Sequence, residues 1–363
     1  MIYPGGNYEK DFSGSTDADG KFEYSLTIGK NGDIGPLSIE VDASNPAYEP
    51  GSVTDSFLLV DSSELSATNN ISSSSEIKQG ISFAAAGDFY CDVRTKKTTK
   101  AMQEKNPDLV LALGDLSEVK NPDCFLGLFS RADKTDKLKV VLGSDDIDNV
   151  NDHSSRFNQY MQHFNLVSPF YSFDYKNIHF LAMATGTDTV IPYASGSPQY
   201  SFVSNDLAQA STNENIDWII VVGYRPFYSS PTAHPGPQNL RSTYPTLFEK
   251  YGVDLILTAH NHNYQRTFPI LSNIERPGKP IIKDGNNTSD YENPGAPIYV
   301  TAGTGGATLQ ELDGQSEFVA NQFAEIGFLN VNITTEDTGK HLQAAFHNSN
   351  NGTTMDRFSI SKS

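Results

Sequence analysis

The 363-residue sequence predicts a large α/β domain that follows a small all-β module. From Ile81 onward, apolar runs of strand length alternate with segments of helical pattern, which is typical of successive βαβ units. Residues 1–62 instead show short alternating runs, separated by Asp-Gly, Asn-Gly and proline turn signals. Residues 63–78 are rich in serine and asparagine, which is linker composition. We therefore expect a β module over 1–62, a linker over 63–78 and the main domain over 79–363.

Three runs in the first module have the period of strands: Phe22–Ile28, Leu37–Val41 and Ser56–Val60. The stretch Thr16–Tyr24 resembles the adhesin-type immunoglobulin-like modules of prokaryotic surface proteins. Three runs are too few for a complete sandwich. We expect a module that is truncated or that packs against its neighbour.

The elements of the main domain are expected in a regular alternation that changes to strands alone near the end. They follow one another as strand 81–86, helix 95–105, strand 109–113, helix 123–131, strand 139–142, helix 155–164, strands 170–175 and 178–184, helix 199–210, strand 217–222, helix 240–251, strand 254–258, and strands 297–302, 327–333, 342–348 and 354–360.

Composition and charge restrict the class of function. A hydrophobic content of 37% suffices for a core, and the sequence has no apolar run of about 18 residues that would span a membrane. The formal net charge of -18 argues against nucleic acids and anionic membranes as partners, because both need basic patches.

Export is expected from the glycosylation sequons of the chain, and its N-terminus shows no signal peptide. The N-terminus lacks the basic and apolar regions of a signal peptide, so we expect a removed signal or a fragment. Glycosylation sequons, which fit export but also arise by chance in an asparagine-rich chain, occur at Asn70, Asn286, Asn287, Asn332 and Asn351.

Acidic turns end several of the predicted strands. Gly87-Asp88, Gly114-Asp115 and Gly143-Ser144-Asp145-Asp146 follow three apolar runs, and His260-x-His262 follows a fourth. In an open α/β sheet the functional crevice lies beyond the carboxyl ends of the strands, so these groups are expected on one rim. Neutral imidazoles at this spacing suit a transition metal. Each Gly-Asp taken alone also fits a plain turn with a helix cap.

The two cysteines follow the first two of these turns. Cys91 lies three residues after Asp88, and Cys124 lies nine residues after Asp115. A disulfide that clamps the two loops would stabilise the protein by about 2–4 kcal/mol. Two unrelated core thiols, or a soft metal ligand, are the alternatives.

The order of these motifs, with Gly223-Tyr224-Arg225-Pro226 between the third turn and the histidines, resembles the calcineurin-like metallophosphoesterases. The resemblance is strongest to the purple acid phosphatase branch and covers roughly residues 79–335. Further matches are Tyr171–Tyr175, His262–Thr267 and Tyr299–Gly306. The resemblance implies a layered α/β/β/α sandwich and hydrolysis of phosphate monoesters by a metal-bound hydroxide.

The resemblance also implies a pair of metal ions, of iron, zinc or manganese, or a single ion. Asp115 would bridge the pair, and Asp88 and His262 would complete the first position. Glu118 stands where the family has an iron-binding tyrosine, and a carboxylate is also an anionic oxygen ligand. At the second position only Asp115 and His260 are unchanged.

Ser144 and Tyr224 occupy the other two places of the second position, where the family has asparagine and histidine. By the same resemblance, Asp145 stands where the family has a histidine that stabilises the transition state or protonates the leaving group. A carboxylic acid could act as that acid only with a raised pKa. His234 lies in the loop that faces substrate in the family, although a loop histidine is more often solvated.

Other candidates have structural interpretations. His179 is expected to pack in a sheet, and Arg266 to form a structural pair. The Gly303–Gly306 turn is not a P-loop, because no Lys-Ser/Thr follows it.

We predict an extracellular or cell-surface metallophosphoesterase, acting on small phosphate esters, with a modified second metal position. A phosphodiesterase or nucleotidase is a variant of this prediction. The alternative is a catalytically inactive surface or binding protein that keeps the phosphatase fold.

Overall fold

The structure is a computed structural model of the chain. It describes residues 35–45, 48–59, 80–117, 122–336 and 339–363. Two compact units divide the chain, Met1–Ser75 and Glu76–Ser363.

In the first unit, β1 (Gly35–Asn45) and β2 (Tyr48–Leu59) pair as an antiparallel hairpin, with Gly35 opposite Leu59. The expected strand Phe22–Ile28 and the stretch Thr16–Tyr24 lie outside the described residues. The immunoglobulin-like module over residues 1–62 therefore stays a prediction.

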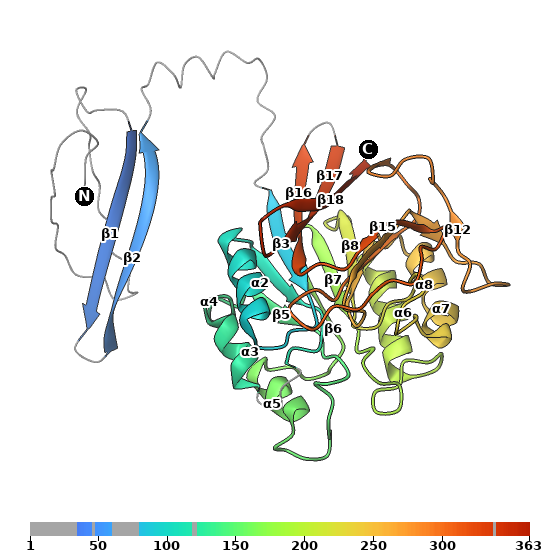
Figure 1. The fold of residues 1–363 in the computed structure, drawn as a ribbon, viewed down its shortest axis with the longest axis horizontal. Coiled ribbons are helices and arrows are strands. Elements are labelled where there is room, and N and C mark those ends of the chain that lie inside the picture. Colours follow the sequence, from blue (N-terminus) through green and yellow to red (C-terminus); the bar gives the residue numbers. More distant parts are fainter. Residues whose placement is uncertain (1–34, 46–47, 60–79, 118–121, 337–338) are drawn as a thin grey trace, which may run out of the picture. The chain divides into compact units, whose positions relative to one another are not determined.

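The second unit is built on two seven-stranded sheets (Figure 1). The first sheet has the order β13 (Asp290–Glu292), β18 (Thr354–Lys362), β17 (Gly339–Asn348), β16 (Gly327–Glu336), β3 (Ile81–Ala86), β4 (Leu109–Ala112), β5 (Leu138–Val140). The second sheet has the order β15 (Val319–Phe323), β10 (Tyr264–Thr267), β14 (Ile298–Ala302), β9 (Leu255–Thr258), β8 (Trp218–Val222), β7 (Ile178–Ala182), β6 (Tyr171–Tyr175). A small pair, β11 (Ile270–Leu271) and β12 (Ile281–Ile282), stands apart from both.

Helices cover the outer face of each sheet, which confirms the predicted α/β/β/α layering. The bounds on the first sheet's side are α2 (Val93–Glu104), α3 (Asp123–Leu128), α4 (Ser130–Lys134) and α5 (Arg156–His163). Those on the second sheet's side are α6 (Pro198–Ala210), α7 (Gln238–Thr243) and α8 (Pro245–Lys250).

The central strands are apolar on both faces because each face is covered. In β3, Phe83 and Ala85 pack in the cluster between the two sheets, while Ala84 and Ala86 pack against the helical layer. This explains why these strands are continuous apolar runs instead of alternating ones. The parallel ladders β3-β4-β5 and β7-β8-β9-β14 direct their carboxyl ends into neighbouring turns.

Two expected helices are each divided in two. The helix predicted over 240–251 is interrupted at Tyr244, because Pro245 has no N–H to donate and disfavours helical geometry in the residue before it. The helix predicted over 123–131 turns at Phe129, whose ring packs on Phe89 and Phe125.

Among the helices of the described residues, none is long and apolar enough to cross a bilayer.

His179 packs in a sheet, as predicted, and it lies between two carboxylates. Its Nδ1 is 2.6 Å from Asp174 Oδ1 and its Nε2 is 2.8 Å from Asp206 Oδ2. Burial lowers the pKa of this imidazole, but the hydrogen bonds to Asp206 and Asp174 outweigh burial and raise the pKa above 6.5. His179 therefore stabilises the fold as a cation.

This pair of contacts predicts a pH dependence of stability. Because the folded pKa is raised, the stabilisation by His179 is complete below pH 6.5 and is lost as the pH rises through the folded pKa. We expect His179→Gln to lower the free energy of unfolding by about 1.5–3 kcal/mol at pH 6, and by less at alkaline pH. Urea unfolding across this pH range measures the difference, with the exposed His153→Gln as control. Parallel stability curves for His179→Gln and wild type would contradict the prediction.

Candidate metal centre

Most of the candidate ligands lie in turns at the carboxyl ends of parallel strands. Asp88 follows β3, Asp115 follows β4, Tyr224 follows β8, and His260 follows β9. The two sheets meet here, because the His260 N–H donates to Asp88 Oδ2 at 2.8 Å. The Asp88 N–H in turn donates to the Gly114 carbonyl at 3.0 Å. The rim predicted from the strand-end motifs is thus one cluster.

Three of these residues have backbone conformations that side chains rarely adopt. Asp88, Asp115 and His260 have φ angles of 59°, 44° and 70°. Left-handed conformations outside glycine carry a steric cost and gather at functional sites. The three candidate ligands therefore lie in strained turns.

His262 and Asp88 face each other at the first metal position. His262 Nδ1 lies 2.8 Å from the Thr308 carbonyl oxygen, so in the neutral ring Nδ1 carries the hydrogen and Nε2 carries a lone pair. Nε2 lies 3.6 Å from Asp88 Oδ1. Asp88 is fully buried, and Oδ1 has no hydrogen-bond partner among the described residues. The neutral imidazole therefore turns its lone pair toward the Asp88 carboxylate, and a protonated imidazole would form an ion pair with it.

Asp115 is buried at the centre of the cluster. Its Oδ1 accepts the Asp145 N–H at 2.8 Å, and its Oδ2 accepts the Tyr224 hydroxyl. Burial, followed by the charges of Asp88 and Asp146, raises the pKa of Asp115 well above its usual value. The cluster without a cation thus disfavours a negative charge on this carboxyl.

The Tyr224 hydroxyl lies at the second metal position, with three neighbours. Besides Asp115, it contacts His260 Nδ1 at 2.9 Å and Ser144 Oγ at 3.2 Å. Burial and the charges of Asp88 and Asp115 raise the pKa of Tyr224 well above its usual value, so the phenol keeps its proton. Ser144 and Tyr224 are thus brought together with the unchanged Asp115 and His260.

His260 remains neutral over the whole range of ordinary pH. Burial, then the positive charges of Arg225, His234 and His262, lower its pKa to about 3. The ring centroid of His234 lies 4.7 Å from that of His260. The Arg225 guanidinium therefore lies close enough to His260 to oppose its protonation.

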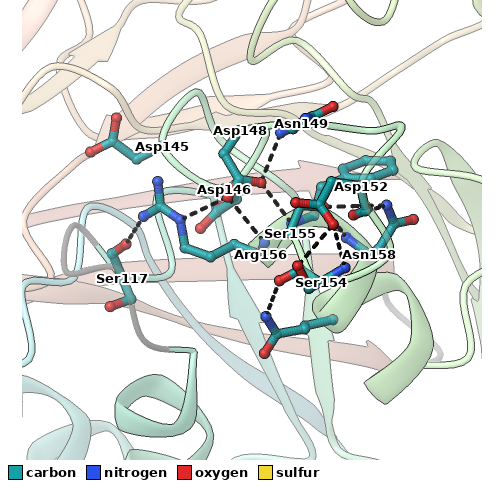
Figure 2. Close-up of polar contacts among 12 residues, drawn as sticks. Ser117, Asp145, Asp146, Asp148, Asn149, Asp152, Ser154, Ser155, Arg156 and Asn158 are labelled. Atoms are coloured by element: carbon teal, nitrogen blue, oxygen red, sulfur yellow. Dashed lines mark hydrogen bonds and ion pairs between the residues drawn. The ribbon is translucent and has the colours of Figure 1, made fainter.

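The predicted catalytic groups border the cluster, since His234 stacks near His260 and Asp145 donates its N–H to Asp115. The His234 and Asp145 side chains are exposed. Figure 2 shows the Asp145 carboxylate apart from the network that joins Asp148 and Arg156. Glu118 lies outside the described residues, so its role as a ligand stays a prediction.

Asp146 holds two of the turns together and was not assigned a role from the sequence. It accepts the Leu116 N–H at 3.0 Å and the Gly143 N–H at 2.8 Å. Burial raises its pKa to about 7 against the lowering effect of these donors. Its place three residues after Gly143, following two other acidic turns, was the available signal. The buried Asn261 was missed as well, and neither of its side-chain polar atoms has a partner among the described residues.

A disulfide joins Cys91 to Cys124, with their Cα atoms 6.0 Å apart. It connects the loop that follows Asp88 with the start of α3. Of the three alternatives given for the cysteines, the disulfide is the one confirmed. By closing a loop of 33 residues it stabilises the protein by about 3–4 kcal/mol in the chain-entropy model.

The two metal positions differ in how well their residues fit an ion. Across the described ranges, no three or more His, Cys, Asp or Glu side chains are arranged so that they could together hold a metal ion. The first position nevertheless fits a cation, because Asp88 Oδ1 is orphaned in a buried site and faces the lone pair of His262. The second position does not fit one, because the Tyr224 hydroxyl fills it.

Two family models match this chain. The model described as "Calcineurin-like phosphoesterase" matches residues 81–264. The model described as "Iron/zinc purple acid phosphatase-like protein C" matches residues 296–357.

Relatives of this chain include acid phosphatases of plants, animals and a fungus. Purple acid phosphatase 21 of Arabidopsis thaliana is 30% identical over 244 residues, which are 62% of this chain and 50% of the relative. "Probable inactive purple acid phosphatase 1" of the same plant is 29% identical over 207 residues, 54% of this chain and 31% of the relative. Human acid phosphatase type 7 is 31% identical over 150 residues, 38% of this chain and 33% of the relative. The chain spans half or less of the length of these relatives.

Solved structures with the same fold include purple acid phosphatase PPD1 from yellow lupin (Lupinus luteus). Its TM-score is 0.62 at 19% identity, over 90% of this chain and 60% of that one. GAP50, described as the anchor in the inner membrane complex of Plasmodium, has a TM-score of 0.55 at 17% identity, over 78% and 89% of the two chains. At these identities the likeness concerns the fold alone.

Proposed function

Because this chain belongs to the calcineurin-like phosphoesterase family, we propose that it hydrolyses phosphate monoesters with the help of a bound metal ion. Asp88, Asp115 and His262 would hold the ion, with Glu118 as a further ligand by analogy with the family. The ion would be iron, zinc or manganese, which accept this mixture of carboxylate and imidazole.

The observation that supports this proposal best is the pair formed by Asp88 Oδ1 and His262 Nε2, 3.6 Å apart. The Thr308 carbonyl fixes the imidazole so that its lone pair faces the carboxylate. A cation bound between the buried Asp88 carboxylate and the partly exposed His262 imidazole would satisfy both groups. A carbonyl that orients a metal-binding histidine from behind is a common feature of metal sites.

A metal ion at this position would polarise a phosphoryl oxygen and neutralise the charge that develops on it during hydrolysis. The chain's own residues bind and orient the substrate. Arg225, which donates from Nε to the Gly186 carbonyl at 3.0 Å, places positive charge near His260. The exposed His234 and Asp145 are the groups proposed to hold the proton that the leaving oxygen takes up.

Removal of the metal tests this function. We expect protein treated with a chelator to lose turnover of p-nitrophenyl phosphate between acid and neutral pH, and to regain it with iron, zinc or manganese. Elemental mass spectrometry of untagged protein measures the metal content in parallel. Protein that binds none of these metals and shows no turnover after their addition would exclude the proposal.

The second candidate is a catalytically inactive surface or binding protein that keeps the phosphatase fold. The observation that favours it is the Tyr224 hydroxyl, which fills the second metal position. Metal-loaded protein that hydrolyses neither p-nitrophenyl phosphate nor bis-p-nitrophenyl phosphate would support this candidate. Turnover of the diester over the monoester would instead indicate a phosphodiesterase.

We place the protein outside the cell or on its surface. The disulfide between Cys91 and Cys124 supports this, because such bonds persist in oxidising compartments. The sequons at Asn286, Asn332 and Asn351 lie on exposed residues, where glycosylation requires them.

A further inference from the structure

The second metal position contains a tyrosine hydroxyl with a complete set of partners. Tyr224 Oη donates its hydrogen to Asp115 Oδ2. The same oxygen lies 2.9 Å from His260 Nδ1 and 3.2 Å from Ser144 Oγ, which both have a hydrogen to offer it. One donor and two accepting lone pairs are what a phenol has, so its hydrogen-bonding capacity is filled.

These three neighbours are the remaining groups of the second metal position. In each neighbour, the atom that could bind a metal instead contacts the Tyr224 oxygen. These atoms are a carboxylate oxygen of Asp115, Nδ1 of His260 and the hydroxyl of Ser144. A metal ion would need these atoms at about 2.0–2.2 Å from its centre. The phenol oxygen already occupies the point on which they converge. We infer that the Tyr224 hydroxyl takes the place of the second metal ion, so that the protein holds at most one metal at this site.

The chain is built to hold the tyrosine in this position. The Tyr224 backbone N–H donates to Thr185 Oγ1 at 2.9 Å, and its carbonyl accepts the Ala259 N–H at 2.8 Å. The ring packs on Gly114, where an added Cβ would lie 2.5 Å from Tyr224 Cδ2. Only 1% of Tyr224 is exposed. Because backbone and ring are both fixed, rotation of the side chain away from the site would open a buried gap and leave the Asp115 oxygen unpaired.

The consequence deepens the proposed function, on which it rests for the identity of the first metal position. A phosphate ester would be held by one ion, with the positive charge of Arg225 nearby, instead of being clamped between two ions. His260 would act by donating from Nδ1 to the phenol, and no longer as a ligand.

Metal stoichiometry tests the inference without reference to activity. We would load full-length wild-type protein and Tyr224→His with excess manganese, remove free ions, and count the bound metal by elemental mass spectrometry. Electron paramagnetic resonance then distinguishes isolated manganese ions from a spin-coupled pair. Tyr228→His is the matched control, since Tyr228 is a buried tyrosine in the cluster on the outer face of the second sheet.

We expect Tyr224→His to bind one more manganese per chain than wild type and to give the signal of a coupled pair. The control should keep the wild-type count. Two metals with a coupled signal in the wild type would overturn the inference, and so would a folded Tyr224→His with no additional metal. If Tyr224→His fails to fold, the wild-type count and signal decide alone, with an isolated ion as the supporting result.

The outcomes separate this inference from the proposed function. A wild type that binds no metal, with a variant that gains one, would support the role of Tyr224 and contradict metal-dependent hydrolysis. A wild type that binds two metals and hydrolyses the substrate would support metal-dependent hydrolysis and contradict the role of Tyr224.

Discussion

Asp115→Asn is expected to reduce turnover of p-nitrophenyl phosphate by at least about 100-fold, because even residues that only orient a metal's ligands contribute 10–100-fold. Asp115 is central to the cluster, since one oxygen fixes the turn at Asp145 and the other holds the Tyr224 hydroxyl. An asparagine keeps the size of the side chain and removes the negative charge that would bind the ion.

The same substitution is expected to stabilise the metal-free protein at neutral pH. Burial and the charges of Asp88 and Asp146 raise the pKa of Asp115 in the folded state above its value of 3.8 in the unfolded chain. The folded state therefore binds a proton more tightly, and its stability declines as the pH rises from 3.8 through the folded pKa. Asp115→Asn removes this decline.

Activity and stability should thus change in opposite directions. Urea unfolding of chelator-treated protein between acid and neutral pH measures the stability, and turnover of metal-loaded protein measures the activity. Asp136→Asn is the control, because this carboxylate is 91% exposed and pairs with Lys139 on the surface. Its effect on stability should stay within about 0.5 kcal/mol. An Asp115→Asn variant that is inactive and also less stable than wild type when metal-free would show that Asp115 mainly supports the fold.

The central strands could be predicted from sequence because their signal is local. Residues 81–86 form an apolar run that ends in Gly-Asp, and the strand ends where the run does. The short strand β10 (Tyr264–Thr267) had no such signal, since Gln265 and Arg266 are polar and yet buried. Burial of polar residues is decided by partners far away in the chain, which a local pattern does not contain.

The same distinction applies to the site. The positions of Asp88, Asp115 and His260 on one rim follow from strand ends, which the sequence indicates. The contact between Tyr224 and Asp115 joins residues 109 positions apart. It depends on how closely the tyrosine ring packs on Gly114. From sequence, Tyr224 was a substituted ligand. Only the arrangement in space shows that its hydroxyl has the other ligands as partners.

Arg266→Leu is expected to lower the free energy of unfolding by about 3–5 kcal/mol, the cost of leaving one charge of a buried pair without its partner. Arg266 Nε donates to Asp356 Oδ2 at 2.6 Å and Nη2 to Asp356 Oδ1 at 2.9 Å. The two side chains are 2% and 4% exposed. Arg266 lies in β10 and Asp356 in β18, so the pair links the two sheets.

Most of this loss of stability comes from leaving the Asp356 carboxylate buried without a positive partner, and less of it from losing the attraction to Arg266. Asp356 also accepts the Tyr264 hydroxyl at 2.8 Å and the Asn321 side-chain amide at 2.9 Å, and these donors do not neutralise its charge. Arg266→Leu combined with Asp356→Leu should therefore recover much of the stability, because replacing both partners removes the unpaired charge.

A double-mutant cycle in urea measures this coupling. Lys100→Ala is the control, since Lys100 pairs with Glu104 on the surface at 3.6 Å and such pairs contribute about 0.3–0.5 kcal/mol. A loss below about 1 kcal/mol for Arg266→Leu would mean that water reaches Asp356 once the arginine is gone. In that case the sheets would be held together by the apolar cluster between them, and the arginine would determine only how the strands are aligned.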